Sequence, residues 1–203
     1  MKKIKFGRRK VVPSKIVCVG RNYVEHIEEL GNEIPENLVI FLKPNSAIAE
    51  DLHAFHEEPL HYEGELSFLF EDGRFSAVGF GLDLTKRELQ SRLKVKGLPW
   101  ERAKAFDGSV VFSPFVAIED IPPSLTVELD IDGTNVQTGT IALMMYKPAT
   151  ILAEISTFMT LEDGDIVMTG TPQGVGVVNA GQVYAGRVKI GEKVLTEGVW
   201  QAK

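Results

Sequence analysis

Residues 60–70 read Leu60-His61-Tyr62-Glu63-Gly64-Glu65-Leu66-Ser67-Phe68-Leu69-Phe70. Apolar side chains fall on the even positions 62, 66, 68 and 70, which is the period of a β-strand, so Glu63 and Glu65 are predicted to share the opposite face. The two carboxylates are then roughly 7 Å apart along the backbone. Like charges this close must protonate, pair with cations or bind a metal when they are partly buried. Gly64 between them permits close approach of a ligand or of another backbone segment.

Length and composition are those of a folded domain. The chain has 203 residues, of which 44% are hydrophobic and 25% charged, and we expect residues 1–203 to form one domain. The formal net charge of −6 disfavours a nucleic-acid partner. The dense basic run in residues 1–12 is predicted to be a solvated N-terminal arm. No signal-peptide pattern or apolar stretch of about 18 residues appears, so we expect a cytoplasmic protein with no membrane partner.

Apolar runs and the residues that interrupt them predict a strand-rich α+β fold. We expect strands at 16–19, 39–42, 62–70, 125–131 and 165–169, and helices at 24–30, 85–96 and 149–159. Residues 45–60 are expected to be loop-rich and residues 98–112 irregular. Cys18, the only cysteine, reads as a small buried side chain and excludes an internal disulfide.

Asp83 is the natural third member of an acidic site, because it stands in the otherwise apolar stretch 77–84. Three carboxylates form an oxygen-only site that suits Mg²⁺, Mn²⁺ or Ca²⁺ rather than zinc. Taken alone, the residues favour a simpler alternative, in which Glu63 and Glu65 lie on a solvent face and Asp83 caps the following helix.

Histidines offer two further candidates. His53, His56 and His61 precede Glu63 closely, but Pro59 and the loop-like composition disfavour a preformed zinc site. His26 and Glu29 are three residues apart on a predicted helix, so Glu29 can orient the imidazole of a general base. On spacing alone, a solvated helix face is the favoured interpretation of this pair.

Two other segments carry polar chemistry. Lys104 lies in a polar, glycine-containing stretch between apolar elements, where it is either a surface residue or a group that holds an anionic substrate or oxyanion. Residues 169–176, Thr-Gly-Thr-Pro-Gln-Gly-Val-Gly, lack the Gly-Lys-Ser/Thr ending of a nucleotide-binding P-loop. A tight turn that offers backbone amides and the Thr171 hydroxyl to a ligand remains an alternative.

In order along the chain, these segments resemble the fumarylacetoacetate hydrolase family, in particular its short members that act on acylpyruvates and oxaloacetate. The resemblance covers most of the chain and rests on the motifs Val17-Cys18-Val19-Gly20-Arg21-Asn22-Tyr23, Phe41-Leu42-Lys43-Pro44, Glu63-Gly64-Glu65-Leu66, Gly81-Leu82-Asp83-Leu84-Thr85, Gly97-Leu98-Pro99-Trp100, Ala103-Lys104-Ala105-Phe106-Asp107 and Thr169-Gly170-Thr171-Pro172-Gln173-Gly174-Val175-Gly176.

The resemblance implies a mixed β-sandwich and β-roll, a homodimer, and Mg²⁺ or Mn²⁺ held by Glu63, Glu65 and Asp83. It also implies that residues 21–37 form a helical lid and that His26, Glu29 and Lys104 are catalytic. Four further positions match residues that line the family's pocket: Arg21, Lys43, Gln90 and Thr171. Residues 135–144 depart from the pattern, because relatives usually carry arginine where this chain has Val136.

These implications give a leading hypothesis of a divalent-metal-dependent hydrolase that cleaves a C–C bond in acylpyruvates, releasing pyruvate and a carboxylate. The alternative within the same scaffold is oxaloacetate tautomerisation or decarboxylation, or a related isomerase or hydratase reaction of a 2-oxo acid. An alternative of another class is a protein that binds such metabolites through a metal without turning them over.

Overall fold

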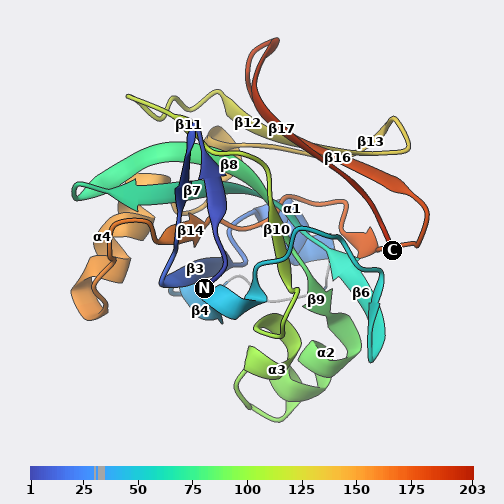
Figure 1. Cartoon of the computed structure of the whole chain (residues 1–203). Coiled ribbons are helices and arrows are strands. Elements are labelled where there is room, and N and C mark those ends of the chain that lie inside the picture. Colours follow the sequence, from blue (N-terminus) through green and yellow to red (C-terminus); the bar gives the residue numbers. More distant parts are fainter. Residues whose placement is uncertain (30, 32–34) are drawn as a thin grey trace.

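The computed structural model describes residues 1–29, 31 and 35–203. In these residues a curled, mixed seven-stranded sheet packs against a four-stranded antiparallel sheet, and helices lie at the periphery (Figure 1). This is the strand-rich α+β architecture expected from the sequence. No helix in the described part of the chain is long and apolar enough to span a membrane.

The seven-stranded sheet carries most of the predicted strands. It consists of β3 (Lys15–Gly20), β4 (Val39–Pro44), β7 (Gly64–Glu71), β8 (Arg74–Asp83), β10 (Val110–Phe112), β11 (Val116–Ala117) and β14 (Ile166–Met168). The order is β10-β8-β7-β14-β3-β4, with β11 also paired to β8. The β14–β3 pair is parallel and β7 runs antiparallel to both β8 and β14.

The two faces of this sheet bury different sets of side chains. On β7, Leu66 and Phe68 pack toward the second sheet, whereas Leu69 joins the core inside the curl of the first. Period-2 alternation therefore directs Glu65 to the inner face of the curl, on the same side as Leu69. Asp83 reaches that face from β8, where it is in phase with the inward-facing Ala77.

The second sheet covers the outer face of the first. It has the order β13-β12-β16-β17 and comprises β12 (Leu125–Ile131), β13 (Thr134–Thr140), β16 (Val183–Ile190) and β17 (Lys193–Gln201). Its apolar residues Val127, Leu129 and Val188 share one buried cluster with the β7 and β8 residues of the first sheet. The strand predicted at 125–131 coincides with β12.

A third, small sheet changes the path of the chain at Glu63. It is formed by β5 (Phe55–His56), β6 (Glu58–Tyr62), β9 (Thr85–Lys86) and β15 (Gly176–Val177). The single strand predicted over 62–70 is wrong at its start, because β6 ends at Tyr62, β7 begins at Gly64, and the two strands belong to different sheets. Glu63 occupies the junction, and its carbonyl accepts a hydrogen bond from the Asp83 amide at 2.9 Å.

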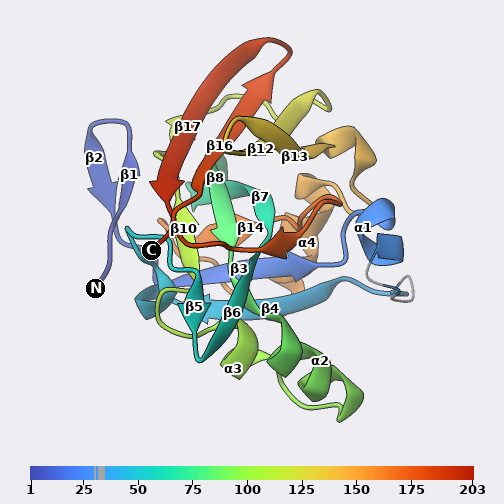
Figure 2. The ribbon, with the colours of Figure 1, turned by 90° about the vertical axis from the view of Figure 1, so that its right-hand side faces the viewer.

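The helices agree with the predictions except in one region and at residues 85–86, which were predicted to begin a helix and instead form the strand β9. They are α1 (Val24–Glu29), α2 (Arg87–Val95), α3 (Glu101–Lys104) and α4 (Pro148–Phe158), with short 3₁₀ turns at Asn45–Ala47 and Ile141–Leu143. Leu30, the expected end of the first helix, lies outside the described residues. The expectation that 98–112 is irregular is wrong, since this region contains both α3 and β10. α2 and α3 lie together beneath the small sheet (Figures 1 and 2).

The basic N-terminal residues form a β-hairpin of β1 (Ile4–Phe6) and β2 (Arg9–Val11), which stands beside the sheets in Figure 2. Its lysine and arginine side chains are exposed, as expected for a solvated segment. Ile4, in contrast, is buried, and the Phe115 amide donates to the Lys5 carbonyl at 2.7 Å. The hairpin is thus attached to the seven-stranded sheet.

Asp165 fastens the start of β3 to the loop before β14. Its carboxylate accepts hydrogen bonds from the Ser14 amide at 2.9 Å and from the Glu162 amide at 2.9 Å, and it pairs with the ammonium of Lys15. Burial alone would raise the pKa of Asp165, but the Lys15 ammonium and the surrounding donors hold it below its usual value. The ionised carboxylate therefore stabilises the fold.

We expect Asp165→Asn to lower the free energy of unfolding by about 2–3 kcal/mol at neutral pH, because buried donors lose a charged acceptor. The folded-state pKa is depressed, so this stabilisation is present above the unfolded-state value of about 3.9 and is lost as the pH falls through the folded-state value. Urea denaturation of both proteins should therefore show a difference that shrinks on acidification. The exposed Asp163→Asn is the control, and equal losses in the two variants would contradict the assignment.

Candidate metal and active site

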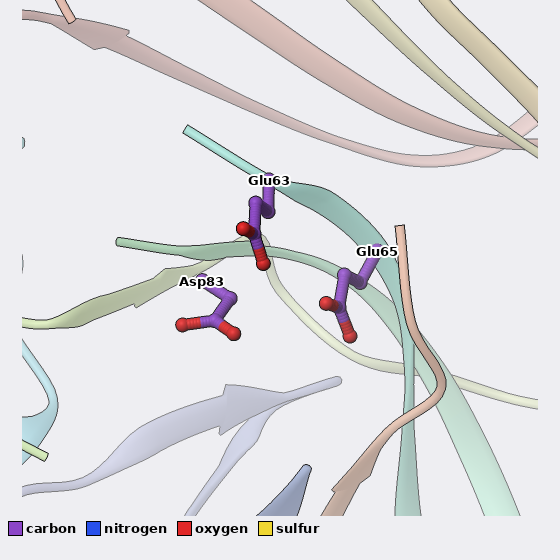
Figure 3. Close-up of side chains that lie close together, drawn as sticks. All are labelled: Glu63, Glu65 and Asp83. Atoms are coloured by element: carbon purple, nitrogen blue, oxygen red, sulfur yellow. The ribbon is translucent and has the colours of Figure 1, made fainter. Parts of the chain in front are cut away.

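Three carboxylates converge at the end of the curled sheet (Figure 3). One oxygen from each of Glu63, Glu65 and Asp83 lies within 4.8 Å of the other two, and all three residues are buried. Glu63 comes from the β6–β7 junction, Glu65 from β7 and Asp83 from the last position of β8. The oxygen-only donor set and its spacing fit a hard divalent cation.

The simpler alternative for these acids is wrong on both points. Glu63 and Glu65 do not lie on a solvent face, since they are only 6% and 2% exposed. Asp83 does not cap the following helix, because the N-cap residue of α2 is Lys86 and the strand β9 intervenes. The turn into α2 is too far along the chain for the Asp83 carboxylate to reach its first amides.

Three cationic side chains surround the acids. The Lys104 ammonium lies 2.8 Å from Glu63 Oε2 and 2.7 Å from Asp83 Oδ2, and it donates to the Thr85 hydroxyl at 2.6 Å. The Lys43 ammonium lies 2.8 Å from Asp83 Oδ1. The Arg87 guanidinium pairs with Glu63 through Nη2. Lys104 and Lys43 are buried, so the surface alternative for Lys104 is also wrong.

These cations affect the two glutamates differently. Burial raises the pKa of Glu63, but Lys104 and Arg87 outweigh it and hold that pKa well below the usual range. Glu65 forms no ion pair among the described residues. Burial raises its pKa, and Asp83 and Glu63 raise it further. The charge of Lys104 and the Gly170 amide, which donates to Glu65 Oε2 at 2.8 Å, offset only part of the rise. Within the triad, Glu65 therefore carries the charge that is least compensated by positive neighbours.

His26 and Glu29 form the pair predicted from their spacing. His26 Nδ1 lies 3.2 Å from Glu29 Oε2, and the His26 side chain is buried rather than solvated. The other carboxylate oxygen of Glu29 accepts a hydrogen bond from the Gly174 amide at 3.0 Å. Glu29 therefore connects α1 to the glycine-rich loop 169–176. When it accepts a hydrogen bond from the Nδ1–H group of His26, the lone pair of the neutral imidazole is on Nε2.

The glycine-rich loop is bound to the acidic segment through Gln137. The Gly64 amide donates to Gln137 Oε1 at 2.9 Å, and Gln137 Nε2 donates to the Thr171 hydroxyl at 2.8 Å. That hydroxyl donates to the Gly64 carbonyl at 3.0 Å. A Cβ at position 64 would meet Gln137 Oε1 at 3.0 Å, so Gly64 does permit the close approach expected of it, although the approaching group is a side chain.

A cavity of about 40 Å³ adjoins the triad, which is room for roughly three water-sized groups. It brings together nearly all of the predicted site residues and is lined by Val19, Gly20, Arg21, His26, Phe41, Glu63, Glu65, Asp83, Arg87, Gln90, Lys94, Trp100, Lys104 and Thr171. Lys43 is absent from this lining. Its ammonium contacts Asp83 Oδ1 and does not line the cavity. The geometry therefore favours a role for Lys43 in holding the Asp83 carboxylate over direct contact with substrate.

Arg21 is held at the cavity by an unusual backbone. Its φ of 56° lies in the left-handed region, which costs a non-glycine residue about 1 kcal/mol or more. The surrounding structure must impose such a strained backbone conformation, and strained residues of this kind cluster at functional sites.

Several residues at the site were not predicted. Arg87 and Lys94 line the cavity from α2, and Gln137 connects two site segments from within the region that departs from the family pattern. Arg87 and Lys94 share a helix face at a seven-residue spacing, which is a signal in the sequence, but charged residues on a helix usually face solvent. Nothing in the sequence distinguishes the buried Gln137 from an exposed strand residue.

The zinc alternative is not supported in the part of the chain that the structure describes. There, the histidines 53, 56 and 61 do not form a cluster of metal-compatible donors with Glu63. His56 instead packs against Phe106 in a tilted arrangement, with the ring centroids 4.9 Å apart.

The Gly170 amide donates a hydrogen bond to the Glu65 carboxylate. We therefore expect Gly170→Ala to weaken divalent-ion binding and to lower the stability of the fold. Its φ is 94°, and a Cβ would meet the Asn22 Cβ at 2.9 Å and the Val19 carbonyl oxygen at 3.1 Å. Gly181 is the matched control, because its φ of 88° is similar but its surroundings are open. We expect Gly181→Ala to cost about 1 kcal/mol and Gly170→Ala about 2–4 kcal/mol in chemical denaturation. Equal costs would show that the contacts at position 170 relax freely.

Comparison with known proteins identifies the family of the chain. Residues 15–198 match the family described as fumarylacetoacetate (FAA) hydrolase C-terminal. The chain is 41% identical to the oxaloacetate tautomerase YcgM of Escherichia coli (strain K12), covering 83% of this chain and 85% of that one. It is 37% identical to the mitochondrial oxaloacetate tautomerase oaa1 of Schizosaccharomyces pombe, covering 86% and 88%.

A solved structure also matches over nearly the whole chain. It is that of fumarylpyruvate hydrolase from Pseudomonas aeruginosa in complex with Mn²⁺ and pyruvate, with a TM-score of 0.90, 28% identity and coverage of 99% of this chain and 95% of that one. In this chain, the buried acidic triad offers an oxygen donor set that suits a divalent ion. The chain belongs to the fumarylacetoacetate hydrolase family.

Proposed function

We propose that the protein is a divalent-metal-dependent oxaloacetate tautomerase, which interconverts the enol and keto forms of that acid. The observation that carries this proposal is the charge of the site. The three carboxylates of the triad are paired with the cations Lys43, Lys104 and Arg87. A divalent ion adds two positive charges in a cavity that Arg21 and Lys94 also line, and a dicarboxylate offsets this added charge more fully than a monocarboxylate does. The E. coli and S. pombe relatives named as oxaloacetate tautomerases support the same substrate.

Mg²⁺ or Mn²⁺ fits the residues present. Glu63, Glu65 and Asp83 would hold the ion, leaving about half of an octahedral shell for water and substrate oxygens. When bound, the ion would supply Lewis-acid stabilisation of negative charge on the 2-oxo oxygen of the substrate. Mn²⁺ in the structure of the P. aeruginosa relative supports this choice of metal.

The chain's own residues move the proton. Conversion of the enol to the keto form requires that the enol oxygen lose a proton and that C3 gain one. His26, which lines the cavity and is oriented by Glu29, is the group we assign to proton transfer at C3. Lys104 fixes the carboxylates of Glu63 and Asp83, and Arg87 does the same for Glu63 while its Nη1 donates to Gln90 Oε1 at 2.8 Å.

The cavity beside the triad is small, at about 40 Å³. We infer that residues 21–37, of which 30 and 32–34 lie outside the described residues, act as a lid that admits substrate. Opening of this lid would break the hydrogen bond from the Gly174 amide to Glu29 and would expose the buried Ile27. Closure would bring His26 to the substrate and exclude bulk water.

A second candidate is hydrolysis of acylpyruvates, and the His26–Glu29 pair is the observation that favours it. An imidazole oriented by a carboxylate can deprotonate a water for attack on the distal carbonyl of a 2,4-dioxo acid. Tautomerisation and hydrolysis use the same base, and they differ in whether a water must be placed beside His26. Decarboxylation of oxaloacetate needs neither this water nor proton transfer at the start.

The test is an assay of three reactions on one preparation with Mg²⁺ or Mn²⁺. Loss of enol-oxaloacetate is followed by ultraviolet absorbance, and pyruvate release is followed from oxaloacetate and, separately, from acetylpyruvate. We expect fast enol loss that a chelator abolishes, with much slower pyruvate release from either acid. Pyruvate release from acetylpyruvate at a rate above that of enol loss would make hydrolysis the function. If no reaction is accelerated although oxaloacetate binds, the protein is a metabolite-binding protein instead.

A further inference from the structure

The loop 171–174 lies directly on strand β13 of the second sheet. A Cβ at Gly139 of this strand would meet the Pro172 Cβ at 2.9 Å. A Cβ at Gly174 would overlap with the carbonyl oxygen of Val136. The loop therefore contacts the strand closely at two points, and the absence of a side chain at each glycine is what allows it.

Gln137, which lies between these two contacts on β13, binds the loop and the acidic segment together. Its Nε2 donates to the Thr171 hydroxyl at 2.8 Å and to the Pro172 carbonyl at 2.9 Å, and its Oε1 accepts from the Gly64 amide at 2.9 Å. These contacts use both donor hydrogens and the oxygen of the side-chain amide, which is buried. Because a buried polar group is costly to leave unpaired, the amide holds the loop in place relative to Gly64.

The loop in turn holds the catalytic base. The Gly174 amide donates to Glu29 Oε1 at 3.0 Å, and Glu29 Oε2 lies 3.2 Å from His26 Nδ1. Helix α1, which carries both Glu29 and His26, belongs to the lid inferred above, whereas the loop is fixed to β13. The loop is thus the surface that Glu29 contacts when the lid is closed. Its position determines where the imidazole stands relative to the metal ligands on either side of Gly64.

We propose that Gln137 is a positioning residue that sets the place of the His26–Glu29 pair relative to the acidic triad by holding the loop 171–174. Gln137 does not line the cavity, so it acts through the Gly174 amide rather than on substrate. The kinetic part of the inference rests on the proposed function. A glutamate at position 137 would still accept the Gly64 amide, but it would turn an oxygen instead of a donor toward the Pro172 carbonyl.

The experiment is a double-mutant cycle between positions 137 and 29, read as decay of enol-oxaloacetate with Mn²⁺. We expect Gln137→Glu to lower kcat about tenfold, as Glu29→Gln should, and to change KM about twofold or less. The double variant should lose about tenfold rather than a hundredfold, because both substitutions break one chain of contacts. Gln201→Glu is the matched control, since Gln201 is an exposed glutamine of the same sheet and should leave kcat unchanged.

If the buried carboxylate of Gln137→Glu prevents folding, Gln137→Met replaces it in the cycle with the same expected losses, because it removes the donors without adding charge. An unchanged kcat, or a hundredfold loss in the double variant, would overturn the inference. Loss of Mn²⁺ binding together with activity would also overturn it, since Gln137 would then act on the metal ligands instead.

Failure of the proposed function gives a different result, namely a wild-type protein that does not accelerate enol decay. The ¹⁵N NMR signals of the His26 imidazole then decide the matter on metal-free protein at alkaline pH, where imidazoles are neutral. We expect the wild type to hold the proton on Nδ1, which Glu29 accepts. Gln137→Glu should shift His26 toward the tautomer mixture of the exposed His53. An unchanged tautomer refutes the inference whatever reaction the protein catalyses.

Discussion

We expect Glu65→Gln to abolish Mn²⁺ binding and, in the presence of a chelator, to raise the melting temperature. Loss of a ligand carboxylate should weaken metal binding by more than about a hundredfold, since loss of a supporting contact alone costs ten- to a hundredfold. The stability should increase because Glu65 is buried, forms no ion pair among the described residues and has a raised pKa. Removing that charge should gain about 1 kcal/mol, or about 2–4 °C, while the side-chain amide oxygen of the variant still accepts the Gly170 amide.

The direction of this effect depends on pH in a defined way. A raised folded-state pKa means that the Glu65 carboxyl favours folding below the unfolded-state pKa of about 4.3, and that this advantage is lost as the pH rises toward the folded-state value. The gain from Glu65→Gln should therefore be absent in acid and appear above about pH 4.3. Melting curves recorded with a chelator across this range measure it.

Glu63→Gln is the matched comparison, with the opposite effect on stability. It also removes a ligand carboxylate, but it takes away the anionic partner of Arg87 and leaves the buried Lys104 with Asp83 as its only acidic partner among the described residues. We expect it to lose metal binding and to destabilise the fold by about 3 kcal/mol. If both variants destabilise the metal-free protein equally, the unequal distribution of cations around the triad is not the controlling factor.

His26→Gln should have the largest effect on turnover among variants that keep the metal. General acid–base catalysis contributes about a hundredfold to ten-thousandfold, so we expect kcat for enol-oxaloacetate to fall at least a hundredfold. Mn²⁺ affinity should be nearly unchanged, because His26 does not belong to the triad. Glu29→Gln, which weakens only the orientation of the imidazole, should cost about tenfold.

His53→Gln provides the control for this prediction, because His53 is exposed and does not line the site cavity. The measurement is stopped-flow decay of the enol absorbance, with Mn²⁺ binding followed by calorimetry on the same samples. A His26→Gln variant that retains wild-type enol decay would assign the proton transfer to another group. Loss of Mn²⁺ binding together with activity would show instead that His26 supports the metal site.

The sequence contained most of the fold because its buried strands alternate plainly. The even-numbered apolar residues of β7 predicted which face Glu65 occupies, and Leu125–Ile131 was read at its observed bounds. The break at Glu63 could not be predicted. The alternation of apolar and polar side chains continues from β6 into β7, although the two strands pair with different neighbours. Whether a strand leaves one sheet for another is decided by β9 and β15, which are two residues long and have no periodicity of their own.

Site residues that lie in the family's sequence motifs could be predicted. Residues that reach the site only because their helix packs beside the cavity could not. On their own, the acids favoured a solvated face, although Asp83 was a candidate because it interrupts an apolar stretch. The family resemblance then favoured the metal site and implied the catalytic role of Lys104. Arg87 and Lys94 read as surface charges on a helix because no local feature reveals that α2 faces the cavity. The homodimer and the cytoplasmic location remain predictions from the sequence.

The junction at Glu63 has a consequence for the choice of metal. Glu63 stands where the small sheet ends and Glu65 where the large sheet begins, so the spacing of their carboxylates depends on how the two sheets are set against each other. Mg²⁺ demands near-ideal octahedral geometry at about 2.0–2.1 Å. Substitutions in the contact between the sheets, far from any ligand, should therefore shift the relative affinities for Mg²⁺ and for larger ions. In this fold, selectivity among metals is a property of sheet packing as much as of the ligands themselves.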